Sequence, residues 1–175
     1  MSSDSHLRLF DLRTPASAKY HLVALIPVHA PPAAGPAEVL THDWNKYSDT
    51  VVATAGVDRV LRTFDVRSPA AGPLAAMHGH QYAVRRIAWS PHHRDVLLSA
   101  SYDMTVRLWA DGSAGAPPAP GPAKAGSELG LMNRHTEFVT GVDWCLFGEG
   151  GWVASVAWDE RVLLWDAGQF LRLRR

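Results

Sequence analysis

The stretch GHQYAVRRIAWSPHHRDVLLSASYDMTVRLW, Gly79–Trp109, contains the pattern on which the rest of the chain is built. His80 is followed nine residues later by Trp89, which closes an apolar run. Asp103 comes fourteen residues after Trp89, in a tight-turn setting, and Trp109 ends an alternating segment six residues further on. Alternation of apolar and polar residues between turn residues predicts short β-strands. We place them here at Val84–Ser90, Val96–Ala100, Thr105–Trp109 and Leu129–Asn133.

The same spacing recurs on both sides of this stretch. It is repeated by His135, Trp144, Asp159 and Trp165 downstream, by Trp44, Asp58 and Phe64 upstream, and in its tail alone by Asp4 and Phe10. A self-similar unit of about 40–45 residues with a Gly-His opening and a Trp-Asp-like close is typical of a blade of a WD-repeat propeller. The sequence therefore predicts an all-β fold, a WD-repeat β-propeller present as an incomplete arc of about three to four blades.

The repeats divide residues 1–175 into parts of one partial propeller. We expect a half blade with strands c and d at 1–28, a full blade at 29–78, a second at 79–134, strands a to c of another blade at 135–166 and a tail at 167–175. Residues Phe170–Leu173 are a weak candidate for the last strand d. The segment 111–127 is rich in Gly, Ala and Pro, and we expect it to be a disordered loop.

An arc of this size is not expected to close a ring by itself, because propellers close with about four to eight blades. One interpretation is a fragment or truncated product that lacks N-terminal blades. The other is an arc that a second copy or a partner completes. In both cases strand edges are left open, which invites pairing with another chain.

Composition excludes several classes of protein. Lys plus Arg number 17 and Asp plus Glu number 17, so no net charge favours nucleic acid or an anionic membrane. Cys145 is the one cysteine, which excludes an intrachain disulfide. No apolar run approaches the roughly 18 residues of a membrane-spanning helix. We expect a soluble, intracellular protein without direct membrane insertion.

Polar residues at fixed spacing predict a buried network in each blade. The sets are His80, Ser99, Asp103 and Trp109, and then His135, Ser155, Asp159 and Trp165. Ser, His and Asp together also resemble a nucleophilic triad. An enzyme needs one such site, however, whereas a repeat needs one in each blade, so we interpret these residues as structural tetrads and the protein as no enzyme. In the first full blade Phe64 replaces the tryptophan and brings no N–H donor.

Metal and nucleotide sites are not expected. The chain has nine histidines, but no Cys/His set has zinc spacing. No Gly-rich phosphate loop precedes a helix. The sequence therefore predicts no cofactor and no metal.

Another group of aromatic and charged residues falls where a propeller has the mouth of its central channel, just before strand a and just before the turn Asp. These residues are Glu38, Tyr82, Arg85, Arg86, Tyr102, Glu137, Phe138 and Trp158. Aromatic residues beside carboxylates suit peptide binding. The alternative is that Tyr102 and Trp158 only cap their turns and that the charges are solvated.

Several short sequence segments contain residues that the blade pattern alone does not require. They are AEVLTHDWNKY at 37–47, GHQYAVRR at 79–86, SYDMTVR at 101–107, HTEF at 135–138 and WDE at 158–160. In them the chain resembles the receptor family for the type-2 peroxisomal targeting signal. The resemblance covers the chain outside its two Pro/Ala/Gly insertions and its last ten residues, and it corresponds to the C-terminal part of that family.

The resemblance implies a non-enzymatic import receptor. Such a receptor is a seven-bladed propeller that binds an N-terminal helical signal on cargo proteins, acts with a peroxisomal import co-receptor, and shuttles between cytosol and peroxisome. Glu38 and Glu137 would face the basic residue of the signal, and the aromatic residues would take its apolar side. The competing interpretation is a generic WD-repeat scaffold or adaptor in a multiprotein complex. Neither involves nucleic acid as a partner.

Overall fold

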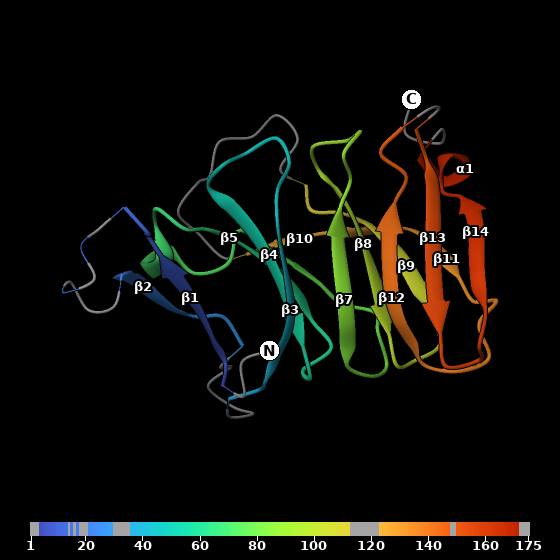
Figure 1. Ribbon diagram of the computed structural model, residues 1–175, viewed down its shortest axis with the longest axis horizontal. Helices are drawn as coiled ribbons and strands as arrows, with labels where there is room; N and C mark the ends of the chain where they lie inside the picture. Colours follow the sequence, from blue (N-terminus) through green and yellow to red (C-terminus); the bar gives the residue numbers. More distant parts are fainter. Residues whose placement is uncertain are drawn as a thin grey trace.

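The computed structural model describes residues 4–13, 15, 17, 21–29, 36–112, 123–147 and 150–171. Its sheets stand side by side in a row, from β1 and β2 at one end to β12, β13 and β14 at the other (Figure 1). The row does not close into a ring in the described part of the chain. This arrangement confirms the predicted fold class, an incomplete β-propeller.

Each sheet is one blade or part of one. The half blade pairs β1 (His6–Phe10) with β2 (Leu22–Pro27). The first full blade has the order β3 (Val39–Trp44), β4 (Val51–Gly56), β5 (Leu61–Asp65) and β6 (Ala75–Met77). The second has β7 (Val84–Trp89), β8 (Val96–Ser101), β9 (Val106–Ala110) and β11 (Ser127–Met132). The last blade has β12 (Val139–Trp144), β13 (Trp152–Ala157) and β14 (Val162–Asp166).

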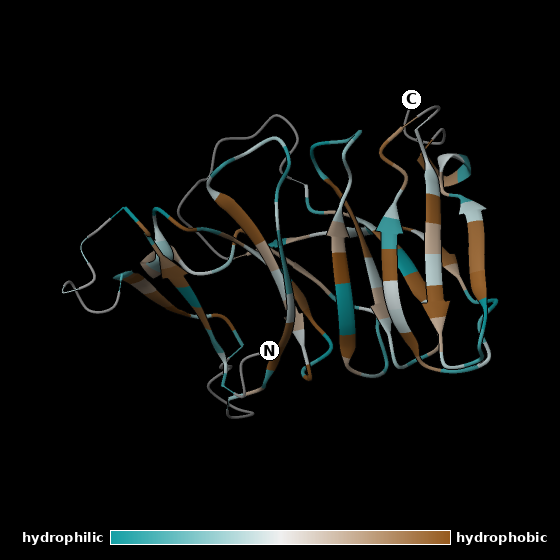
Figure 2. Cartoon of the chain, in the orientation of Figure 1, coloured by the Kyte–Doolittle hydropathy of each residue, from teal (hydrophilic) through white to brown (hydrophobic). Residues whose placement is uncertain are grey.

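The core lies between the blades. Ala53, Leu61 and Met77 of the first full blade pack with Ile87, Trp89 and Trp109 of the second. A second cluster joins that blade to the last one, and a third joins the half blade to β3 and β5. β8 is buried at all six positions because it has a blade on both faces, and Figure 2 shows the hydrophobic bands along the central strands.

Hydrogen bonds also join neighbouring blades along their inner strands. Thr41 Oγ1 accepts the backbone N–H of Ile87 at 3.2 Å, and Asp43 Oδ2 accepts that of Trp89 at 2.7 Å. On the other side, Trp144 Nε1 donates to the carbonyl of Ala88 at 3.0 Å. Strand edges that face another blade thus find polar partners, as buried backbone groups require.

The expectation of a loop throughout 111–127 is wrong at its C-terminal end. Residues 113–122 lie outside the described residues, but Lys124–Ala125 form strand β10 and Ser127 begins β11. β10 pairs in parallel with β6 of the preceding blade, where Lys124 N donates to Leu74 O at 2.9 Å. The segment forms a strand because the outer edge of β6 is free to pair with it, and the composition of the segment gives no sign of this pairing.

The candidate strand d at Phe170–Leu173 is also wrong. Gly168–Leu171 form the short helix α1, and residues 172–175 lie outside the described residues. Phe170 packs over Gly130 of β11, so closely that a Cβ at position 130 would overlap its ring. The outer edge of β14 has no fourth strand among the described residues.

A short 3-10 turn at Pro69–Ala71 connects β5 to β6. None of the described helices is long and apolar enough to cross a membrane.

Candidate functional site: the channel mouth and the groove along the inner strands

The inner strands β3, β7 and β12 carry the same irregularity near their starts. In β7, Val84 lies opposite Ser101 and Arg86 opposite Ala100, so that Arg85 is an extra residue. Leu40 in β3 and Thr140 in β12 occupy the same place. Such a bulge re-aims the side chains beside it.

Backbone hydrogen bonds tie the two loops of each blade together at the channel mouth. The residue before each turn Asp donates its N–H to the residue before each inner strand: Val57 to Glu38 at 3.0 Å, Tyr102 to Ala83 at 3.1 Å and Trp158 to Phe138 at 3.0 Å. Gly56 allows this approach in the first blade, because a Cβ there would overlap the carbonyl oxygen of Glu38.

These contacts place most of the residues singled out from the sequence on one rim, which we call the aromatic rim: Glu38, Tyr82, Tyr102, Glu137, Phe138 and Trp158. Phe138 lies between two neighbours, with its ring centroid 4.9 Å from that of Tyr102 and 5.2 Å from that of Trp158. Tyr102 and Trp158 are 6.4 Å apart. These separations are those of aromatic pairs in contact.

Exposure on the aromatic rim is high. Tyr82 and Trp158 are each 63% exposed, and Glu38 and Glu137 are exposed as well. Neither glutamate forms an ion pair with a described residue. Val57 is equivalent in its blade to Tyr102 and Trp158 and is 46% exposed; sequence reasoning missed it because valine there carries no aromatic signal.

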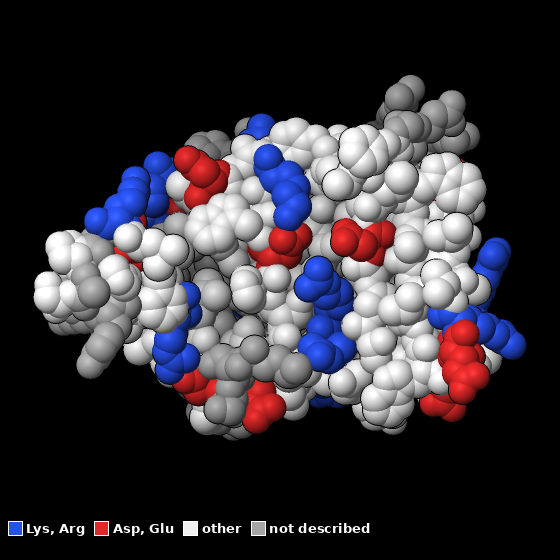
Figure 3. Space-filling model, in the orientation of Figure 1, with Lys and Arg blue, Asp and Glu red and all other residues white. Residues whose placement is uncertain are grey.

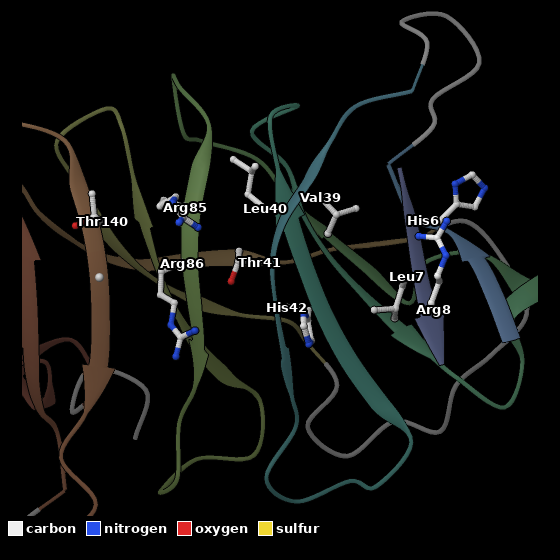
Figure 4. Close-up of a pocket in the computed structure, with 11 residues that line it drawn as sticks. His6, Leu7, Arg8, Val39, Leu40, Thr41, His42, Arg85, Arg86 and Thr140 are labelled. Carbon is white, nitrogen blue, oxygen red and sulfur yellow. The ribbon is translucent and has the colours of Figure 1, made fainter. Parts of the chain in front are cut away.

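Arg85 lies apart from the aromatic rim, on strand β7 itself. It lines a cavity of about 640 Å³ that runs along the inner strands β3, β7 and β12 and reaches β1 of the half blade, which we call the channel groove (Figure 4). The groove is lined by His6, Leu7, Arg8, Val39, Leu40, Thr41, His42, Arg85, Arg86, Thr140 and Gly141. No carboxylate is among these residues.

The structure brings the predicted tetrad of the second full blade together. His80 Nδ1 lies 2.8 Å from Asp103 Oδ2, and His80 Nε2 lies 2.6 Å from Ser99 Oγ. Trp109 Nε1 donates to the same Ser99 Oγ at 2.7 Å. Burial raises the pKa of Asp103. The hydrogen bond and the charge from His80, together with the hydrogen bond from Thr105, outweigh this effect and hold the pKa below its ordinary value.

In the last blade the tetrad is incomplete. His135 lies 2.8 Å from Asp159 Oδ2 and 2.9 Å from Ser155 Oγ, yet the buried indole nitrogen of Trp165 has no hydrogen-bond partner among the described residues. The pKa of Asp159 is lowered, because hydrogen bonds from His135 and from two backbone N–H groups outweigh its desolvation.

In the first full blade, where Phe64 stands in place of the tryptophan, an arginine joins the polar network through the turn Asp. His29 contacts Asp58 at 2.8 Å and Thr54 Oγ1 at 3.0 Å, and Arg62 donates to Asp58 Oδ2 at 2.6 Å. Burial raises the pKa of Asp58, but His29 and Arg62 together lower it to about 2. Arg62 was not anticipated, although its place four residues after the turn Asp is a usable signal.

The His–Ser/Thr–Asp geometry therefore occurs in three successive blades, with the histidine and the hydroxyl buried in each. Such a network stabilises the blade interior. Among the described residues no group of three or more His, Cys, Asp or Glu side chains is arranged to hold a metal ion.

Repeated blades with these buried networks define the fold, an incomplete β-propeller built from WD repeats. The family model for the WD domain, G-beta repeat, matches residues 71–110 and 126–166. The sequence is similar to the peroxisomal targeting signal 2 receptor of Saccharomyces cerevisiae, with 35% identity over 94% of this chain and 48% of the relative. For the receptor of the same name from Komagataella phaffii the identity is 39%, over 94% of this chain and 45% of the relative.

These similarities confirm the resemblance inferred from the sequence. A histone acetyltransferase type B subunit 2 from Debaryomyces hansenii is also similar, with 31% identity over 98% of this chain and 41% of the relative. The chain spans less than half of the length of each of these relatives.

Proposed function

We propose that this arc binds the type-2 peroxisomal targeting signal of cargo proteins as part of a peroxisomal import receptor. The observation that carries the proposal is the aromatic cluster of the half-buried Tyr102 and Phe138 with the exposed Trp158, and Glu137 next to it in the chain. The similarity to proteins named peroxisomal targeting signal 2 receptor supports it.

The chemistry of the aromatic rim suits an amphipathic helix with a basic residue. Aromatic side chains offer a large apolar surface at small entropic cost, and such surfaces hold most of the energy of peptide interfaces. Glu38 and Glu137, which have no ion pair within the described chain, would face the basic residue of the signal. Arg85 carries the same sign of charge as that residue, so it borders this site rather than contacting the charge.

The rest of the pathway belongs to the same proposal. The receptor would act without catalysis, deliver cargo with a peroxisomal import co-receptor, and shuttle between cytosol and peroxisome. Its partners would be cargo proteins and that co-receptor, with no nucleic acid.

Fluorescence anisotropy with a labelled signal helix tests cargo binding. We expect saturable binding that Glu38→Lys with Glu137→Lys weakens about tenfold or more, because both carboxylates would become repulsive. Asp49→Lys is the matched control, since Asp49 is exposed between β3 and β4, at the opposite end of the strands. Equal affinity of the reversed and control variants would rule out the proposed contact.

Trp158→Ala separates binding from stability on the aromatic rim. Because Trp158 is 63% exposed, we expect little change in the free energy of unfolding and a clear loss of affinity for the helix. Unchanged affinity would show that Trp158 only caps its turn.

A scaffold function is the second candidate. It is favoured by the similarity to the histone acetyltransferase type B subunit 2, which covers nearly the whole chain. A protein that ignores the signal helix but binds another polypeptide through the same rim would support it.

A further inference from the structure

We propose that the channel groove is a second binding site, separate from the aromatic rim, and that it takes an acidic peptide segment through Arg85 and Arg86. Both side chains lie on β7 between Thr41 of β3 and Thr140 of β12 (Figure 4). The inference does not depend on cargo binding at the rim.

The β7 bulge is the reason that two consecutive residues line one groove. In a regular strand, neighbouring side chains point to opposite faces. The extra residue at the bulge breaks this alternation, so that Arg85 and Arg86 both line the cavity. Leu40 with Thr41, and Thr140 with Gly141, line it from the equivalent positions of the flanking blades.

Comparison of the three blades shows that the blade itself does not require arginine at this place. The flanking blades form the same bulge with uncharged residues, Leu40–Thr41 and Thr140–Gly141. Within the described chain, neither the Arg85 nor the Arg86 side chain has a hydrogen bond or an ion pair. Arg85 is half-buried and Arg86 is exposed, whereas the half-buried Arg62 and Arg107 both have carboxylate partners.

The surrounding charges indicate what ligand fits. His6, Arg8 and His42 add basic groups to the groove, although Arg8 is already paired with Asp4 at 2.6 Å. Figure 3 shows a positive patch over the middle of the inner strands with negative groups beside it. A guanidinium group binds carboxylates through paired hydrogen bonds, so a segment with several carboxylates matches this patch.

The carboxylates around the groove set the direction of the ligand. Glu38 and Glu137 lie at the strand starts, and Asp43 and Asp143 lie further along the same strands, two residues after Thr41 and Gly141. An acidic segment is therefore repelled at both ends of the strands. It fits across them, from β7 toward β1, where Leu7, Val39 and Leu40 offer apolar contacts.

The test uses the whole chain and labelled octapeptides in fluorescence anisotropy. The probe alternates Glu and Leu, and its matched control alternates Gln and Leu. We expect saturable binding of the Glu peptide only, with an affinity that falls as salt is raised, because exposed charges are screened. Equal binding of both peptides would overturn the proposal.

Two variants then locate the site. We expect Arg85→Gln and Arg86→Gln each to weaken the Glu peptide about tenfold, as the loss of a charged hydrogen bond predicts. Arg67→Gln is the control, because the Arg67 side chain is 72% exposed in the loop after β5. Equal losses in all three variants would overturn the proposal, as would no loss in any of them.

Inorganic phosphate distinguishes a peptide site from a site for a small anion. We expect phosphate to compete no better than the same ionic strength of sodium chloride. Displacement of the peptide by low-millimolar phosphate would overturn the peptide assignment in favour of a free-anion site. Unchanged circular dichroism and melting of each variant are required before its affinity is compared, and Arg→Lys at 85 or 86 replaces any variant that fails.

Discussion

Trp109 donates its indole N–H to Ser99 Oγ at 2.7 Å, whereas the equivalent Trp165, one blade later, has a buried indole nitrogen without a partner in the part of the chain that the structure describes. The two blades therefore allow a comparison, within one chain, between a tryptophan that makes this hydrogen bond and one that does not. A satisfied buried donor stabilises its blade, and an unsatisfied one carries a desolvation cost that nothing offsets.

We therefore expect Trp109→Phe to lower the free energy of unfolding by about 1–2 kcal/mol more than Trp165→Phe. Both substitutions remove a similar volume, so the difference reports the hydrogen bond. Urea denaturation of the two variants measures it. Equal losses of unfolding free energy in the two variants would mean that the hydrogen bond from Trp109 to Ser99 contributes nothing to stability.

His80→Ala tests whether the tetrad is structural. His80 is 5% exposed and joins Asp103 to Ser99. Its removal therefore leaves a cavity and takes one hydrogen-bond partner from each of Asp103 and Ser99. We expect a loss of about 2–4 kcal/mol relative to His78→Ala, in which an exposed histidine is removed from the same loop. If the two variants melt at the same temperature, the buried network is not what holds this blade.

The lowered pKa of Asp58 gives the protein a defined acid sensitivity. Its folded-state pKa of about 2 lies below the ordinary 3.8, so the unfolded chain takes up the proton first as pH falls. The stabilisation by ionised Asp58 is complete above about pH 5 and is lost as pH falls toward 2.

Asp58→Asn cannot titrate, so the difference in unfolding free energy between wild type and variant should narrow by about 2 kcal/mol from about pH 6 to about pH 2. Chemical denaturation at a series of pH values measures this difference. A constant difference across the range would contradict the ion pairs with His29 and Arg62.

The open end of the arc predicts self-association. Val162 and Leu164 on β14 are 67% and 70% exposed, next to Trp152 at 49%, and Figure 2 shows this end strand as hydrophobic. An exposed apolar edge strand promotes pairing with a second copy. Sedimentation velocity should show a larger species at higher concentration.

Val162→Lys with Leu164→Lys should abolish that species, because charge on an edge strand blocks pairing. Val57→Lys is the control, since Val57 is 46% exposed in a turn away from the terminal sheet. Self-association that persists in the double variant would place the contact elsewhere.

The sequence by itself determined the blades. Val84–Ser90, Val96–Ala100 and Thr105–Trp109 were expected as strands, and β7, β8 and β9 begin within about one residue of them. This succeeds because period-two alternation and the turn Asp are local signals that every blade repeats. The same spacing brought His80, Ser99 and Asp103 into one set.

Only the tertiary structure decided what lies beside what. It paired β10 with β6, packed Phe170 over Gly130, and left Trp165 without a partner. It also moved Arg85 from the expected rim into the channel groove with Arg86. Bulges, packing between blades and the satisfaction of buried polar groups depend on neighbours distant in the chain, and a periodic pattern contains no information about them.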